Sequence, residues 1–242
     1  MQSHSVLQRP ANDVEIWDKW NSAWRQGPLT DDPSKARLAA IGRTLDELKL
    51  RDAKILEVGC GTGWLSAKLS EFGNVTACDL GSHIIETAQK NYPHIKFVSG
   101  DIQSLNLPTN HFDLLVTSEV LSHVPDQPAF ISRLAELIRP GGLLILTSQN
   151  KYVFDRTANI PPPEGWIRRW VTMKILKGLL RPYFSIRRAT TVEPEGHLGF
   201  LRFVNSKKVN RFCNALIGEA RTKRLKERAG FGQSLYVIAV KR

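Results

Sequence analysis

The residues with the clearest chemical potential are a run of glycines, Gly59-Cys60-Gly61-Thr62-Gly63-Trp64, that directly follows an apolar segment. Glycine permits left-handed backbone and close approach to a ligand, as in nucleotide-binding turns. A phosphate-binding P-loop needs a lysine after its last glycine, and none is present. A dinucleotide turn needs a small residue where this chain has Trp64. The turn therefore predicts a nucleoside ligand that has no pyrophosphate.

A carboxylate at a suitable spacing supports the same ligand class. Asp79 ends the next apolar segment, 20 residues after Gly59. A carboxylate at the end of a second strand can accept hydrogen bonds from both ribose hydroxyls. Asp is also favoured at helix N-caps, so capping of the next helix is the alternative role for Asp79.

The elements that would position these residues follow from the alternation of short apolar runs with helical patterns. Strands are expected at 53–59, 74–80, 94–101, 112–119, 143–149 and 234–242, and helices at 33–50, 63–73, 83–93, 128–142, 173–181 and 205–220. Such alternation predicts an α/β chain with a parallel, doubly wound sheet. Residues 221–228 either extend the last helix or form a strand antiparallel to the final one. Trp17, Trp20 and Trp24 fall on one face of a further helix, for core packing or for a share in a site roof.

The chain resembles class I S-adenosylmethionine-dependent methyltransferases in four successive motifs, "LEVGCGTG", "VTACDL", "SGDIQSL" and "FDLLVTSEVLSHVPD", and in "LIRPGGLLILTS" before their fifth strand. The resemblance covers residues 50–150 and resumes weakly after residue 195. It implies a Rossmann-like, doubly wound, mostly parallel seven-stranded sheet with an antiparallel last strand. We expect a single domain, 1–242, with a helical N-terminal cap (1–50), a cofactor-binding core (51–150), an inserted lid or substrate region (151–204) and a C-terminal helix and strands that complete the sheet (205–242).

The resemblance also implies which residues bind the cofactor, S-adenosyl-L-methionine. Four would line its methionine end, namely Glu57, Gly59, Cys60 and Gly61. Asp79 and Leu80 would hold the ribose and pack near the adenine. Asp101 would bind the adenine amino group, with Ile102 against the ring. Ser118 and Glu119 would border the methionine part near the transferred methyl group, and no metal site is expected.

Two histidines are candidate general bases, because an oxygen acceptor must lose its proton during methyl transfer. His123 follows the fourth predicted strand, and His197 lies in "EGHLGF" near the end of the region expected as a lid. Histidine titrates near neutrality, and a general base contributes roughly 10²–10⁴-fold to a rate. We name both residues as catalytic candidates, with His123 preferred.

The acceptor class is narrowed by motifs that are missing. The position after the fourth strand lacks the Pro-Pro motif of enzymes that methylate exocyclic base amines, and Cys213 does not fit a cytosine-C5 nucleophile. The segment "SEVLSHVPD" instead resembles the branch of the family that acts on small molecules. This resemblance implies methyl transfer to a small molecule, with oxygen preferred over nitrogen or carbon as the accepting atom and a lipid-linked or anionic acceptor as a refinement. An RNA or protein methyltransferase and a cofactor-binding regulator without turnover remain alternatives.

Charge is unevenly distributed and bears on partners. Residues 151–242 hold 20 Lys and Arg against 6 Asp and Glu. Within them, residues 173–181 form an amphipathic basic pattern that suits a substrate lid or peripheral contact with an anionic membrane. Three distant cysteines and the lack of an 18-residue apolar run indicate a reducing compartment and a cytoplasmic protein, with membrane association as a further possibility. Nucleic acid is disfavoured as a partner, and the oligomeric state stays open.

Overall fold

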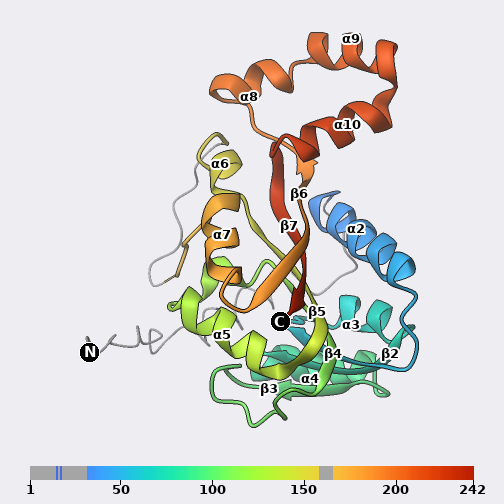
Figure 1. Ribbon diagram of the computed structural model, residues 1–242, viewed down its shortest axis with the longest axis vertical. Helices are drawn as coiled ribbons and strands as arrows, with labels where there is room; N and C mark the ends of the chain where they lie inside the picture. The colour runs from blue at the N-terminus through green and yellow to red at the C-terminus, as the bar shows by residue number, and fades with distance from the viewer. Residues whose placement is uncertain (1–14, 16, 18–31, 158–165) are drawn as a thin grey trace.

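A seven-stranded sheet with the order β3-β2-β1-β4-β5-β7-β6 forms the centre of the computed structural model, which describes residues 15, 17, 32–157 and 166–242 (Figure 1). The strands are β1 (Ala53–Val58), β2 (Gly73–Asp79), β3 (Lys96–Ser99), β4 (Phe112–Ser118), β5 (Ile138–Gln149), β6 (Phe184–Pro194) and β7 (Gly232–Lys241). Strand β7 is antiparallel to β5 and β6, whereas the pairs among β1 to β5 are parallel. The predicted doubly wound sheet with an antiparallel last strand is confirmed.

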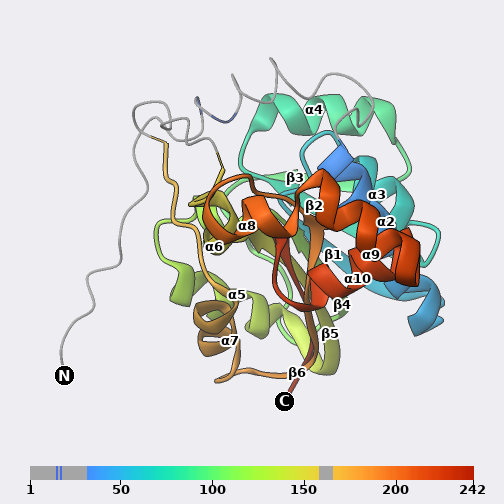
Figure 2. The ribbon, with the colours of Figure 1, turned by 90° about the horizontal axis from the view of Figure 1, so that it is seen from above.

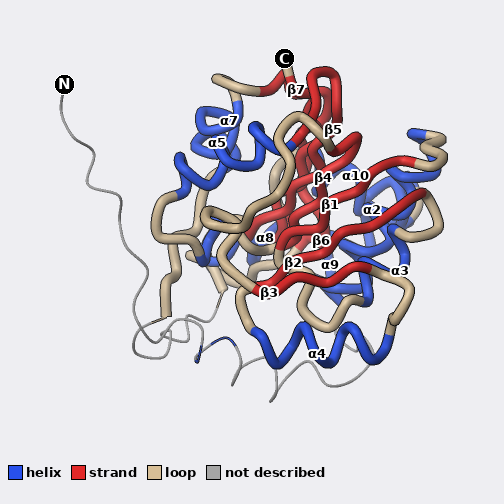
Figure 3. Tube along the Cα trace, turned by 90° about the horizontal axis from the view of Figure 1, so that it is seen from below, coloured by secondary structure: helices blue, strands red, loops and turns tan. Residues whose placement is uncertain are grey.

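Helices cover both faces of this sheet. Those beside the sheet are α2 (Asp32–Leu48), α3 (Trp64–Leu69), α4 (Ser82–Asn91), α5 (Gln127–Leu137) and α7 (Met173–Leu180), and the short η1 (Leu121–His123) and α6 (Lys151–Phe154) follow β4 and β5. Figures 1 and 3 show α5 and α7 on one face and α2, α3 and α4 on the other. Helix α2 lies within the predicted N-terminal cap (1–50), most of whose first 31 residues lie outside the described part of the chain. Trp17, the first of the three tryptophans predicted to share a helix face, is helical in the structure, whereas Trp20 and Trp24 lie outside the described residues.

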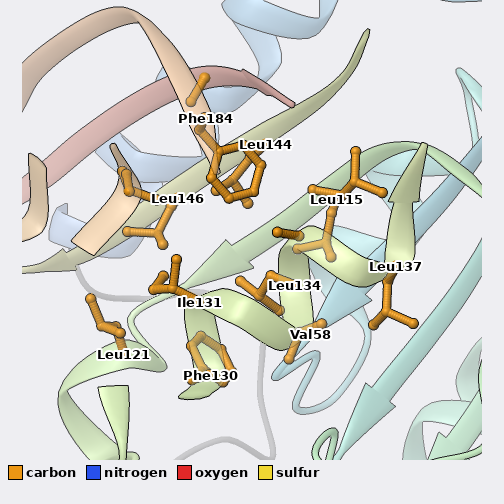
Figure 4. Packing of buried hydrophobic residues seen from close by; sticks show 14 of the residues in the cluster. Val58, Leu115, Leu121, Phe130, Ile131, Leu134, Leu137, Leu144, Leu146 and Phe184 are labelled. Atoms are coloured by element: carbon orange, nitrogen blue, oxygen red, sulfur yellow. The ribbon is translucent and has the colours of Figure 1, made fainter. Parts of the chain in front are cut away.

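Two apolar cores result from the alternation of side chains along each strand. Ile55 packs with the α2 side of the sheet, and its neighbour Leu56 packs with the α5 side. On the α5 side, Phe130 and Leu134 of the helix face Leu144 and its neighbours in the sheet (Figure 4). These strands are buried on both faces, which explains why their sequences read as continuous apolar runs.

Helix α2 is fastened to the sheet through a buried tyrosine. The Tyr236 hydroxyl of β7 lies 2.8 Å from Thr44 Oγ1 and 3.3 Å from the Ala40 carbonyl oxygen. Burial raises the pKa of Tyr236 to about 12, so the hydroxyl stays neutral and can donate. Helix α2 is therefore held at a fixed place over the sheet.

Strand β6 lies inside the region that we expected to be an inserted lid. This strand was not predicted from the sequence, because Arg187 and Arg188 interrupt the apolar pattern. In the structure its pairing register with β7 also shifts between Ile186 and Arg188. Basic residues suit β6 because it is the edge strand, where lysine and arginine discourage further pairing. Residues 221–228, left open between helix and strand, belong to the helix α10 (Glu219–Arg228).

A segment of three helices connects β6 to β7. It comprises α8 (Gly199–Val204), α9 (Lys207–Ile217) and α10, and we call residues 195–231 the α8–α10 lobe. Pro194 pairs with Gly232, and Gln149 of β5 pairs with Ser234, so the lobe leaves the sheet at the edge where β5 ends. Strands β1, β2 and β4 end at this same carboxyl edge because they are parallel to β5. Figure 2 shows the lobe in front of the sheet when the molecule is seen from above.

No helix among the described residues is long and apolar enough to cross a membrane.

Candidate active site

The glycine turn joins β1 to α3 at the carboxyl edge. Gly59, Gly61 and Gly63 have φ angles of +80°, +53° and +84°, a region that other residues adopt only with strain. A Cβ atom on Gly59 would overlap the Val120 side chain, and one on Gly63 would lie 2.8 Å from the Phe97 ring. Gly59 and Gly63 are therefore required by both backbone conformation and space.

Hydrogen bonds tie this turn to the end of β2. The amides of Gly59 and Cys60 donate to the Cys78 carbonyl oxygen at 2.8 and 3.1 Å. The amide of Gly61 donates to Asp79 Oδ2 at 2.8 Å, and the amide of Gly81 lies 3.4 Å from Asp79 Oδ1. A carboxylate offers about four acceptor positions, so these bonds are compatible with further donors such as ribose hydroxyls. Asp79 thus has a structural role and the right place for the predicted binding role.

Glu57 is a buried acid beneath the turn. It lies near the end of β1, is 2% exposed, and accepts a hydrogen bond from Ser66 Oγ of α3. Burial, with a smaller contribution from the nearby charge of Asp79, raises the pKa of Glu57 to about 8. At neutral pH it is therefore mostly protonated.

Burial also raises the pKa of the Cys60 thiol, so little of it is thiolate, the nucleophilic form, at neutral pH.

The end of β3 brings the next pair of predicted residues to the same edge. The amide of Gly100 donates to the Asp79 carbonyl oxygen at 2.9 Å. Asp101 follows, and its Oδ1 accepts from the Gln103 amide at 3.0 Å, which shapes the local turn. Ile102 is buried in the core, whereas Leu80 is partly exposed. Leu80, Asp101 and Ile102 therefore lie along the ends of two adjacent strands, as predicted.

Ser118 ends β4, and Glu119 directly after it lies next to an arginine that was not predicted from the sequence. Ser118 Oγ lies 3.1 Å from Thr147 Oγ1, and the Glu119 amide donates to the Thr147 carbonyl oxygen at 3.1 Å. Arg37 Nε of α2 lies 4.0 Å from Glu119 Oε1, and both side chains are nearly buried. Nothing in the local sequence marks Arg37, because only the packing of α2 on the sheet brings it here.

His123 ends the short helix after β4, with its two ring nitrogens facing different partners. Trp166 Nε1 donates to Nδ1 at 3.0 Å, and Nδ1 also lies 3.0 Å from the Ile167 carbonyl oxygen. Nε2 lies 3.4 Å from Gln149 Nε2, and Gln149 Oε1 accepts from Ser122 Oγ. Nδ1 therefore faces Trp166 and Ile167, whereas Nε2 faces Gln149.

Aromatic rings and a strap of backbone enclose His123. The ring centroids of Trp17 and Trp166 lie 4.8 and 5.9 Å from that of His123. Residues 166–171, which we call the strap, run along η1, where the Arg169 amide donates to the Ser122 carbonyl oxygen at 2.8 Å.

Gln149 was not among the predicted site residues, although it ends the predicted strand 143–149. The rule that polar residues at strand ends belong to the site would have found it.

His197 lies elsewhere. Its side chain is exposed on the α8–α10 lobe, and its backbone amide lies 3.2 Å from the Arg156 carbonyl oxygen. It lines a polar hollow with residues such as Glu193, Asn205 and Lys226. Strand β6, which leads to it, is four places from β1 in the sheet. The structure therefore places His197 on the lobe, at the opposite end of the strand order from β2 and β3 and four strands from β1, which leads into the glycine turn.

The described residues contain no group of three or more His, Cys, Asp or Glu side chains that could hold a metal ion.

Comparisons with known proteins agree with this geometry. Residues 56–146 match the protein family described as "Methyltransferase domain". The ubiquinone biosynthesis O-methyltransferase of Coxiella burnetii (strain Dugway 5J108-111) is 33% identical over 139 residues, 55% of this chain and 58% of that protein. The mitochondrial enzyme of the same name from Schizosaccharomyces pombe is 32% identical over 48% of this chain and 44% of its own length. The chain thus spans about half the length of these curated relatives.

Solved structures extend the likeness of fold to nearly the whole chain. N-methyltransferase NodS from Bradyrhizobium japonicum WM9, in complex with S-adenosyl-L-homocysteine, superposes with a TM-score of 0.66 at 16% identity, covering 95% of this chain and 98% of that one. The [4+2]-cyclase SpnF superposes with a TM-score of 0.62 at 20% identity, covering 98% and 99%. Because one of these neighbours is a cyclase, the fold alone does not determine the reaction.

Proposed function

We propose that this chain, whose residues 56–146 match the methyltransferase domain family, is a class I S-adenosylmethionine-dependent methyltransferase that transfers a methyl group to an oxygen atom of a small-molecule acceptor. The observation that carries the proposal is the bond between the glycine turn and Asp79. It gathers at one edge the close-approach backbone and the carboxylate that an adenosine ligand requires.

The residues at the carboxyl edge fit the cofactor, which supplies an activated methyl group on a sulfonium when bound. Asp79 would hold the ribose hydroxyls, and Asp101 the adenine amino group, with Leu80 and Ile102 beside the ring. The glycine turn, Ser118 and Glu119 would border the methionine end. The Arg37 guanidinium, nearly buried beside Glu119, balances that carboxylate and suits a ligand carboxylate. The absence of a lysine after the glycines is consistent with a cofactor that has no phosphate.

His123 is the better supported of the two candidate bases. Nε2, the ring nitrogen that faces Gln149, would take the proton of an acceptor hydroxyl, while contacts with Trp166 and the Ile167 carbonyl oxygen hold the Nδ1 side of the ring. The contact of Gln149 with Nε2, at 3.4 Å, is at the long end of hydrogen bonding, so an acceptor hydroxyl can replace it. Trp17 and Trp166 limit water around the ring, which favours positioning and desolvation of an acceptor. His197, exposed on the lobe, has none of this surrounding.

The acceptor class is supported by the curated relatives, whose names describe O-methylation in ubiquinone biosynthesis. We propose a hydroxylated aromatic acceptor, with a lipid-linked one as the refinement. Aromatic walls from Trp17 and Trp166 suit a flat ring by edge and face contacts. The N-methyltransferase among the structural neighbours makes an amine the competing acceptor.

A labelled-methyl assay tests this function. The full chain is incubated with labelled S-adenosylmethionine and, separately, with catechols bearing or lacking an isoprenoid tail, with amines of matched size, with total RNA and with a protein extract. We expect label in the catechols. Label confined to amines, RNA or protein would replace the proposed acceptor. Cofactor binding with no transfer to any extract fraction would favour a regulator without turnover.

A further inference from the structure

The α8–α10 lobe concentrates the large apolar side chains that are exposed in the described part of the chain. Seven of the nine such residues lie between positions 198 and 225, and they are Leu198, Phe200, Phe203, Phe212, Leu216, Ile217 and Leu225. Five of them, Phe200, Phe203, Phe212, Leu216 and Leu225, are more than half exposed. Exposed apolar groups in this density mark a contact surface rather than an ordinary solvated face.

Helix α9 shows the pattern most clearly. This helix is strongly amphipathic, yet none of its residues is buried. Phe212 and Leu216 are 66% and 67% exposed and lie one turn apart, so they share the outer side of the helix. Lys208 precedes Phe212 by one turn and is also exposed, and exposed Arg211 lies beside it. The outer side of α9 therefore combines bulky apolar groups with flanking cations.

The lobe is also strongly basic. Residues 199–228 hold nine Lys and Arg and two Asp and Glu, a net charge of +7. Arg221, Arg224 and Arg228 of α10 follow helical spacing along one exposed side, with Leu225 beside them. Lys223 and Lys226 point instead to partners within the protein, at Glu193 and at two asparagines. The outward charge of the lobe thus comes mainly from arginines and from Lys207 and Lys208.

The position of the lobe allows contact with an extended flat surface. In Figure 1, α8 and α9 lie at one end of the longest axis of the molecule, beyond the sheet and its helices. Seen from above in Figure 2, the lobe lies in front of the sheet. A plane that touches α8 and α9 therefore does not meet the body of the domain.

We propose that the α8–α10 lobe docks on the surface of an anionic phospholipid bilayer, with Phe200, Phe203, Phe212 and Leu216 in the interfacial layer and the arginines and lysines at the headgroups. Apolar side chains flanked by cations are the combination that binds such a surface. RNA fits less well, because Leu216, Ile217 and Leu225 offer aliphatic groups that cannot stack on bases. The net charge of +7 complements the anionic leaflet.

The pattern of residues 173–181 suited either a substrate lid or peripheral membrane contact. In the structure Leu176 and Leu180 of α7 are buried in the core against α5, whereas seven large apolar side chains of the lobe are exposed. The lobe and the candidate site share the carboxyl edge of the sheet, so docking would place the site near the membrane. Docking itself does not depend on the reaction or on the acceptor proposed above.

Vesicle flotation of the full chain tests the proposal. We expect binding to vesicles of equimolar phosphatidylglycerol and phosphatidylcholine, little binding to pure phosphatidylcholine, and weakening with added salt. The variant Phe212→Asn/Leu216→Asn should lose binding by at least about tenfold, since each buried methylene contributes about 0.8 kcal/mol. The matched control is Ile175→Asn, which changes a 48% exposed residue of α7 outside the lobe and should bind as wild type does.

Three outcomes would overturn the proposal. They are equal binding to both vesicle types, unchanged binding of the double variant, and RNA binding that is tighter than vesicle binding and insensitive to the same substitutions. Circular dichroism confirms that each variant folds, which is expected because the changed side chains are exposed. Calorimetry of S-adenosylmethionine binding by the double variant should match wild type, so failure of docking is distinguishable from failure of the proposed function.

Discussion

The backbone amide of Gly61 donates to the carboxylate of Asp79 at 2.8 Å, and this bond joins the glycine turn after β1 to the end of β2. One carboxylate thereby shapes the turn and, in the function proposed above, would also bind the ribose hydroxyls. Substitutions at Asp79 and in the turn should consequently affect the ligand and the local structure together, whereas changes elsewhere should separate the two effects.

Replacement of Asp79 by alanine should lower the affinity for S-adenosylmethionine by at least about tenfold, because hydrogen bonds to a charged group contribute about 1.5–3 kcal/mol each. Isothermal titration calorimetry measures the effect. The control is Asp46→Ala, which removes an exposed carboxylate from α2 and should leave affinity unchanged. Equal affinities for the Asp79 variant and wild type would remove Asp79 from the cofactor site.

Gly59→Ala should destabilise the protein. A residue with a Cβ at φ +80° costs about 1–2 kcal/mol, and the overlap with Val120 adds roughly 1–3 kcal/mol of overpacking. Urea unfolding followed by circular dichroism gives the free energy of unfolding. Gly178→Ala is the matched control, because a Cβ added to Gly178 of α7 would meet no atom within 4 Å, and alanine there should stabilise by roughly 0.5–1 kcal/mol. Similar unfolding energies for the two variants would contradict the required role of Gly59.

Glu57 should make stability depend on pH. Its folded pKa of about 8 lies above the reference value of 4.5, so between these values the folded state holds a proton that the unfolded state has released. The contribution of Glu57 is therefore complete below pH 4.5 and is lost as the pH rises towards 8. The slope is about 1.4 kcal/mol per pH unit where one proton separates the two states. Urea unfolding across this range should show the loss in wild type and a flatter profile in Glu57→Gln, and parallel profiles would argue against a protonated Glu57.

His123→Ala should lower kcat for an oxygen acceptor by roughly 10²–10⁴-fold, the usual contribution of a general base. His197→Ala should retain turnover, because His197 is exposed on the lobe and apart from the glycine turn. Steady-state kinetics with a labelled cofactor compare the two variants directly. The reverse ranking would make His197 the base and His123 a residue that fastens the strap.

Gln149 should act as a positioning residue through His123. Its side-chain amide nitrogen lies 3.4 Å from His123 Nε2. Gln149→Glu would place a carboxylate there and favour the charged imidazole, so the acidic limb of the kcat/KM profile should move to higher pH. Gln149→Met, which keeps the volume and adds no charge, should leave that limb near its wild-type pH. A uniform loss of rate with an unmoved profile would indicate a purely structural role.

Much of this site could be predicted from the sequence because its parts lie at the ends of strands. Functional residues were expected at or just after the last positions of predicted strands, as with Asp79 and Glu119. Parallel strands end at one edge of a sheet, so linear order alone indicated that these residues would meet. Strand β6 escaped prediction because an edge strand with paired arginines lacks the apolar run that marks a buried strand.

The sequence by itself determined the nature of the glycine turn, the order of the strands along the chain and the carboxylates at their ends, because these depend on short-range spacing. Only the tertiary structure decided that Arg37 lies beside Glu119, that Gln149 lies beside His123, and that His197 lies on the lobe. It also showed that Leu176 and Leu180 of α7 are buried, whereas large apolar side chains of α8 and α9 are exposed. Such relations depend on how distant elements pack, and an amphipathic helix does not reveal in its sequence which neighbour, if any, will bury its apolar face.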